Sequence, residues 1–198
     1  HYVGIVKDDL DSENKPQFAS QGYLVSKQAV DASSRNIMPK SKSYIAAKTG
    51  DKAGTVTAST GGATSTEANF KQWFRDVPGV NLSKTVPIVL VRQANSNIYS
   101  FSDKTDATYS GKGGFFPING ELFGNPPNQS KNFGFTFELD TEFVYKKGTG
   151  QTFTFTGDDD VWVWVNGKLV IDLGGVHGAT SQTIELDRCN WLQSGKTY

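Results

Sequence analysis

Apolar and polar residues alternate most clearly in the last third of the chain, where the pattern predicts β-strands. From Phe133 to Asp140 the odd positions are apolar and the even positions are small or charged. This period of two is expected for a strand with one buried face. The alternation resumes at Phe153 and ends at Gly157. We therefore predict two antiparallel strands, one over residues 133–145 and one ending at Gly157.

The next segment predicts a β-hairpin. Val161–Val165 is apolar on both faces, which is typical of a strand that is buried on both sides. Asn166-Gly167 follows, and this dipeptide is the strongest short hairpin signal because both residues accept a positive φ. On the returning strand the apolar residues alternate over 169–173, which puts Asp172 on a partly polar face and predicts that it serves the hairpin.

Earlier in the chain the apolar pieces are short, and they predict strands separated by long surface loops. The stretch 55–62 is too polar for a core and is predicted to be an exposed loop.

One amphipathic helix is expected near residue 70. Phe70, Trp73 and Phe74 have helical spacing, and Thr64 and Glu67 have the spacing of a capping box. We predict that this aromatic stripe packs into the core.

Composition supports an all-β fold. The 198 residues and 21.6 kDa suffice for one domain with its own core, and 21 glycines with 12% aromatic residues are typical of strands and turns.

Twenty basic residues balance twenty acidic ones, so a nucleic-acid partner is not expected. The apolar stretches are far shorter than the roughly 20 residues that span a bilayer, so membrane insertion is not expected either. The single Cys189 is predicted to be a buried thiol, the alternative being a disulfide partner outside these 198 residues, and so few cysteines favour an extracellular setting.

Three carboxylates are crowded into the connection Asp158-Asp159-Asp160. Two charges about 4 Å apart repel by roughly 4 kcal/mol at an effective dielectric constant near 20. Backbone N–H groups, a raised pKa or a bound cation could offset this repulsion. Among cations, calcium suits carboxylate oxygens best, although one short turn cannot supply its full shell. The alternative is an aspartate-rich turn that simply faces solvent.

The run from Gly157 to Gly178 resembles the signature of the fibro-slime domain, a branch of the protective-antigen (PA-fourteen) superfamily. The similarity extends upstream through residues 69–81, 115–117 and 132–145.

This resemblance implies an antiparallel β-sandwich of the protective-antigen type, with one short helix and long loops, in a secreted or cell-surface protein. It also implies that Asp158 and Asp159, joined by a cis peptide bond, bind a calcium ion that coordinates sugar hydroxyls. Asp160 stands where many members have glycine and is counted with the metal ligands. Residues 1–198 are expected to form a single domain that is incomplete at both ends, so a further chain or segment is expected to complete the sandwich.

Four residues near this turn are candidate contacts for a glycan or cell-surface polysaccharide: Trp162, Gly174, Gly175 and His177. An indole ring can stack on the apolar side of a sugar, although the strand pattern favours core packing for Trp162. The glycines could present backbone oxygens beside the turn, and a plain exit from the strand explains them equally well.

Two other readings stay open. Glu138, Asp140 and Glu142 have a spacing near that of an inverting glycosidase pair, but an outer strand face explains them as well, and we predict no enzymatic activity. The other alternative is an extracellular matrix or signalling module in which the cation is only structural. The reading favoured by the sequence is a lectin-like or adhesin-like module that binds carbohydrate through calcium.

Overall fold

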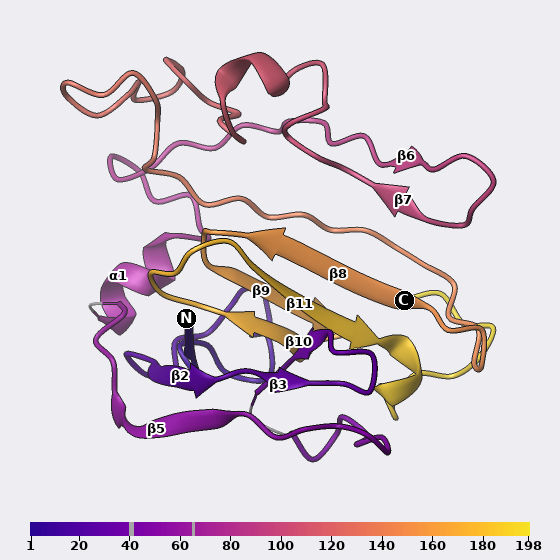
Figure 1. The fold of residues 1–198 in the computed structure, drawn as a ribbon. Coiled ribbons are helices and arrows are strands. Elements are labelled where there is room, and N and C mark those ends of the chain that lie inside the picture. The colour runs from indigo at the N-terminus through magenta and orange to yellow at the C-terminus, as the bar shows by residue number, and fades with distance from the viewer. Residues whose placement is uncertain (40–41, 65) are drawn as a thin grey trace. The chain divides into compact units, whose positions relative to one another are not determined.

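The computed structural model describes residues 1–39, 42–64 and 66–198, which form two compact units (Figure 1). Unit 1 comprises His1–Phe74 and Leu139–Tyr198, and unit 2 comprises Arg75–Glu138. Whether residues 1–198 form a single domain stays a prediction, because an insertion within one domain and a separate second domain both give this division.

Unit 1 is built from antiparallel strands, which confirms the all-β fold class. Its strands are β1 (Tyr2–Val3), β2 (Tyr23–Lys27), β3 (Ala29–Val30), β4 (Asn36–Ile37), β5 (Thr55–Thr60), β8 (Thr152–Gly157), β9 (Val161–Val165), β10 (Lys168–Leu173) and β11 (Thr180–Glu185). Its helices are α1 (Glu67–Gln72) and a 3-10 turn over Leu186–Arg188. The pairs are β1–β2–β5, β9–β10, β8–β11 and β3–β4.

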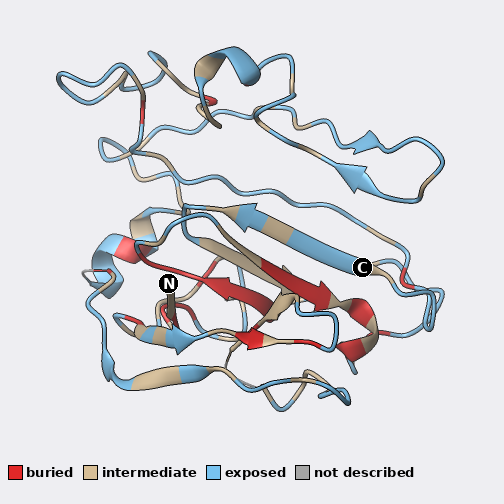
Figure 2. Cartoon of the chain, in the orientation of Figure 1, coloured by how far each residue is buried: buried red, intermediate tan, exposed pale blue. Residues whose placement is uncertain are grey.

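A core cluster lies along β9, β10 and β11, and Figure 2 shows buried residues on β10 and β11, whereas β8 is largely exposed. Val165, Ile171 and Ile184 are buried members, and Phe155 packs against them. Both strand pairs therefore contribute to the same core, in the manner of a sandwich. Cys189 also lies in this cluster, 2% exposed, and burial raises the pKa of its thiol to about 12. The prediction of a buried thiol is confirmed.

A second core cluster lies beside β1 and α1. Ile5, Phe70 and Leu169 are fully buried there, and Trp162 and Trp164 pack against them. Strand β9 thus directs its valines to one cluster and its tryptophans to the other. This confirms the prediction of a strand that is packed on both faces.

The β9–β10 hairpin forms as predicted. Asn166 and Gly167 have φ values of 47° and 77°, the positive values that a tight hairpin turn requires. The register shifts between Leu169 and Ile171, so β10 contains a bulge. With the bulge and the cover on both faces, every residue from Leu169 to Leu173 is buried.

The predicted pairing of a strand over 133–145 with the strand ending at Gly157 is wrong. Residues 133–143 form no strand, and Phe133 is 62% exposed. Backbone hydrogen bonds instead join Phe143 to Tyr198, and β8 pairs with β11. Alternation indicates which face of a segment is apolar, but a strand also needs a neighbouring strand for its backbone hydrogen bonds. Strand β8 pairs with β11 and not with residues 133–143.

The loop predicted over 55–62 is also different in the structure, because β5 occupies Thr55–Thr60 and pairs with β2. Threonine and valine have high strand propensity. Strand β5 is largely exposed, so most of its side chains can be polar although it belongs to the sheet β1–β2–β5. Polarity alone therefore did not distinguish a loop from an exposed strand.

The predicted helix near residue 70 is present as α1, but the predicted capping box of Thr64 and Glu67 is not its N-cap. Its N-cap is Thr66, whose side chain accepts a hydrogen bond from the Asn69 backbone N–H at 3.2 Å, and Thr64 lies outside the helix. Phe70 is fully buried, whereas Trp73 is 39% exposed. The stripe packs into the core mainly through Phe70.

Unit 2 contains the short hairpin of β6 (Val91–Arg92) and β7 (Tyr99–Ser100) and a 3-10 turn over Ser110–Lys112. Its aromatic side chains gather around Phe115, whose ring centroid lies 4.8 Å from that of Tyr109 and 5.0 Å from that of Phe137. Tyr109 is only 4% exposed. The alternating residues of the expected strand thus pack as an aromatic cluster within this unit.

Candidate functional site

The aspartate turn lies where the sequence predicts it, between the end of β8 at Gly157 and the start of β9 at Val161. Asp158, Asp159 and Asp160 are all exposed. Because β8 and β9 belong to the packed part of unit 1, the turn is an exposed acidic connection between two fixed strand ends.

The peptide bond between Asp158 and Asp159 is trans, as are all peptide bonds of the described residues. This differs from the cis bond that the resemblance implied. For a residue other than proline the trans form is the more stable by about 3 kcal/mol.

Asp160 interacts with two other residues of the predicted site. Its carboxyl retains solvent contact, but neighbouring protein removes enough water to raise its pKa. The backbone N–H of Gly175 donates a hydrogen bond to this carboxyl, and the His177 ring also favours its ionised form, whereas the Asp159 charge opposes it. The structure thus brings Asp160, Gly175 and His177 together.

Gly174 is buried and is held by the backbone of β1. Its N–H donates to the Tyr2 carbonyl at 2.9 Å, and its carbonyl accepts from the Tyr2 N–H at 2.6 Å. A side chain here would lie 2.6 Å from Ile5 Cδ1. Packing therefore accounts for Gly174, and its role as a ligand contact stays a prediction.

His177 is half-buried beside His1, with the two ring centroids 6.0 Å apart in an edge-to-face arrangement. Its Nδ1 lies 2.9 Å from the Gly178 carbonyl oxygen, a contact that requires the proton on Nδ1. Its Nε2 has no hydrogen-bond partner within the described ranges.

Trp162 points away from the turn and into the fold. Its ring packs on Phe70 with centroids 5.8 Å apart, and its indole N–H donates to Asp172 Oδ1 at 3.2 Å. A stacking role for Trp162 stays a prediction, and the observed contacts are those of a core residue.

The donor atoms of this turn can be compared with the number of ligands that a calcium ion requires. It takes roughly 6 to 8 oxygen ligands. In the part of the chain that the structure describes, no three acidic, histidine or cysteine side chains are grouped so that they could hold a metal ion. The turn has the right kind of donor but too few of them. Calcium here would need backbone, solvent or glycan oxygens to complete its shell.

Asp172 corrects the prediction of a hairpin residue on a partly polar face, because its side chain is buried and 2% exposed. Gly4 N–H donates to its Oδ2 at 2.9 Å, and its own N–H donates to the Gln182 side chain at 2.8 Å. A signal for this burial was present: β9 is apolar on both faces, so the strand paired with it is covered on both faces too.

The acidic residues of the glycosidase reading, Glu138, Asp140 and Glu142, are all exposed. Among the described residues no helix has the length and apolar character needed to cross a membrane.

Comparison with known proteins supports the family resemblance. A model of the PA14 domain matches residues 117–198. The protein psiR of Dictyostelium discoideum is 41% identical over 140 residues, which is 67% of this chain and 13% of psiR. From the same organism, psiQ is 41% identical over 142 residues, 65% of this chain and 13% of psiQ, and psiD is 36% identical over 139 residues, 67% of this chain and 25% of psiD.

The matches cover only a minor share of these longer relatives. No solved structure shows a significant match. The fibro-slime branch stays a prediction. Residues 117–198 match the PA14 domain, and the antiparallel sheets of the structure are consistent with a PA14-type fold.

Proposed function

We propose that this chain is a secreted or cell-surface carbohydrate-binding module, lectin-like or adhesin-like, that holds calcium at the Asp158–Asp159 turn and performs no chemistry on the glycan. The observation that carries the proposal is the exposed acidic turn between β8 and β9 in a PA14-type domain. Bound there, calcium would coordinate hydroxyl oxygens of a sugar.

The surrounding residues favour this use of the turn. Asp158 and Asp159 place two exposed carboxylates next to each other in the chain. Both carboxylates can supply oxygen ligands to an ion at the surface without any rearrangement of the core. The Gly175 N–H orients the neighbouring Asp160 carboxyl. His177, beside Asp160, is the predicted ligand residue best placed to contact a bound sugar.

The number of side-chain donors sets the expected affinity. With two or three carboxylates and the rest of the shell from backbone, solvent or glycan oxygens, we expect binding near the millimolar range, as in extracellular calcium modules. A glycan that supplies hydroxyl ligands should therefore increase the affinity for calcium, and calcium should increase the affinity for the glycan by the same factor.

The test is a calorimetric titration of calcium into metal-stripped protein, followed by a glycan array with and without calcium. The variant Asp158→Asn/Asp159→Asn should lose both calcium and glycan binding. Asp140→Asn/Glu142→Gln removes the same charge from another exposed segment and is the matched control. Equal loss in both variants would mean that net charge, and not the turn, binds the ion.

The remaining outcomes separate the alternatives. Calcium binding that raises thermal stability without any glycan signal would favour a matrix or signalling module with a structural cation. Release of reducing sugar from the array glycans would contradict the proposal that the chain is not an enzyme, and dependence of that release on Glu138 or Asp140 would support a glycosidase. Calcium binding only after a further chain or segment is added would show that the site needs ligands from it.

A further inference from the structure

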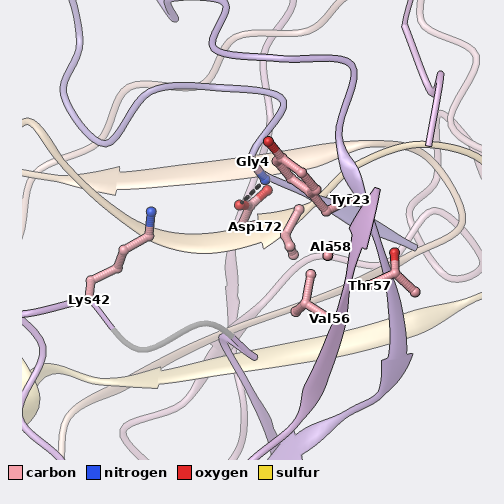
Figure 3. Close-up of a pocket in the computed structure, with 8 residues that line it drawn as sticks. Gly4, Tyr23, Lys42, Val56, Thr57, Ala58 and Asp172 are labelled. Carbon is pink, nitrogen blue, oxygen red and sulfur yellow. Dashed lines mark hydrogen bonds between the residues drawn. The ribbon is translucent and has the colours of Figure 1, made fainter. Parts of the chain in front are cut away.

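A cavity of about 410 Å³ lies within unit 1, apart from the residues assigned to the aspartate turn (Figure 3). Its walls come from β1, β2 and β5 and from Asp172 of β10. Val3, Val56 and Ala58 provide apolar side chains, and Tyr23 provides an aromatic ring. Its volume falls within the range of small-molecule pockets, roughly 300–1,000 Å³.

Asp172 gives the cavity one buried acidic group. Its carboxylate accepts hydrogen bonds from the Gly4 N–H and the Trp162 indole N–H, at 2.9 Å and 3.2 Å. A carboxylate has about four acceptor positions, so these two bonds leave capacity for a ligand. Burial raises its pKa to about 6, and the group is therefore mainly ionised at neutral pH.

The Asp172 charge has no direct counter-ion in the described part of the chain. Lys42 also borders the cavity, but its ammonium forms an ion pair with Asp8 and lies apart from the Asp172 carboxylate in Figure 3. A buried charge without an ion-pair partner is unfavourable. A ligand that brings a positive charge to this carboxylate would relieve that cost.

The Tyr23 ring is placed to cover such a ligand. It lies against Gly4, where an added Cβ would be 3.3 Å from Tyr23 Cδ2, and the Gly4 N–H is the group that donates to Asp172. Gly4 has a φ of 76°, which favours glycine and allows this close approach. An ammonium group beside an aromatic face gains a cation–π attraction in addition to the ion pair.

We propose that this cavity binds a small ammonium compound, a protonated amine on a compact apolar body, with the nitrogen at Asp172 and the body against Val3, Val56 and Ala58. A polyhydroxylated sugar fits less well, because Val3, Val56 and Ala58 offer no hydrogen-bond partners on the apolar side of the cavity and the hydroxyls facing them would stay unpaired. A metal ion fits less well because only one carboxylate faces the cavity. The proposal is independent of the calcium turn.

The experiment is an NMR titration of the whole ¹⁵N-labelled chain with cyclohexylammonium chloride, and with cyclohexanol as a neutral probe of the same shape. The Gly4 amide and the Trp162 indole N–H both donate to Asp172, so their resonances report on the carboxylate directly. We expect saturable shifts of both resonances with the amine and about tenfold weaker binding of the alcohol, because an ion-paired hydrogen bond is lost.

Two variants leave Asp172 unchanged, and one of them is designed to fill the cavity while the other leaves it open. Ala58→Phe places a ring in the cavity from an exposed position of β5 and should abolish the shifts. Ser59→Phe changes the next, equally exposed position of β5, which is not among the residues that line the cavity, and is the matched control. Asp172→Asn should weaken amine binding about tenfold while leaving cyclohexanol binding unchanged.

Several results would overturn the proposal. Equal binding of amine and alcohol would show an apolar cavity without charge selection, and amine binding that survives Ala58→Phe would show attraction to acidic surface residues. Stronger binding of glucose than of the amine would assign the cavity to a sugar. If Asp172→Asn does not fold, the comparison of Ala58→Phe with Ser59→Phe, together with the two probes, still decides the question.

Discussion

At the scale of single residues, Gly175 is fixed by both its backbone and its surroundings. Its φ is 72°, and an added Cβ would lie 2.3 Å from Tyr2 Cδ2 and 2.9 Å from Ala63 Cβ. We expect Gly175→Ala to lower the free energy of unfolding by at least about 1–2 kcal/mol, measured by urea denaturation. Gly178→Ala is the control, because nothing lies within 4 Å of that site. Similar losses in both variants would contradict the packing argument.

Asp172 should give stability an unusual pH dependence. Burial raises its pKa to about 6 from an ordinary value of 3.8, so between these values the folded state binds more protons than the unfolded state. Its contribution to stability is therefore fully present below pH 4 and is lost as the pH rises through about 6. The pKa difference corresponds to a few kcal/mol, on the order of 2–3.

The measurement compares urea denaturation of the wild type and Asp172→Asn at several pH values from 4 to 7. The variant should lack this fall in stability, so the difference between the two proteins should change steadily across that range. A constant difference would mean that the carboxyl titrates at its ordinary value.

At the scale of elements, an ion-pair network joins the end of β11 to loops near β3 and β4. Arg188, 4% exposed, donates to both Asp51 oxygens at 2.6 Å and 2.8 Å. Glu185 of β11 also accepts from Arg188, at 3.2 Å, and from Arg35 and Lys48, each at 2.5 Å. The Arg188 hydrogen bonds lower the pKa of Asp51 to about 2.

This lowered pKa predicts the opposite pH behaviour from Asp172. The stability from Asp51 is present above its unfolded pKa of 3.8 and is lost as the pH falls through about 2. Asp51→Asn should cost about 2 kcal/mol at pH 7 and progressively less towards pH 2, measured by chemical denaturation. Asp140→Asn, at an exposed site, should change stability little at either pH. A cost for Asp51→Asn that does not depend on pH would argue against the ion pair.

Elements whose partners are close in sequence were predictable. Val161–Val165, Asn166 and Gly167 specify the β9–β10 hairpin through local turn chemistry and burial, and the aspartate turn followed from it. The partner of β8 was not predictable, because Thr180–Glu185 lies beyond that hairpin and its residues are largely polar. Local periodicity contains no information about which strand pairs with which.

The candidate site follows the same division. The position of the aspartate turn, between the strand that ends at Gly157 and the strand that begins at Val161, could be predicted from the sequence. The cavity at Asp172 could not, because it is assembled from β1, β2, β5 and β10, which are brought together only by the fold. Moreover, residues 55–62 were predicted to be a loop, so β5, which forms one wall of the cavity, was not expected.

At the scale of the whole molecule, both core clusters consist of residues from unit 1. We therefore expect unit 1 to fold when Arg75–Glu138 is replaced by a flexible Gly/Ser linker. Hydrogen exchange should show protected amides in β9, β10 and β11 at the level of the full chain. A truncated chain without a cooperative unfolding transition would show that unit 2 is required for the core.

Besides pairing with β2, the segment around β1 forms hydrogen bonds with residues far along the chain. The Tyr2 backbone pairs with Gly174, the Gly4 N–H with Asp172, and the Asp8 carbonyl with the Leu169 N–H. During synthesis the Gly4–Asp172 hydrogen bond can form only after Asp172, which follows Gly4 by 168 residues, has been made. Such distant pairing slows folding, and during that interval the nascent segment is open to chaperones and proteases.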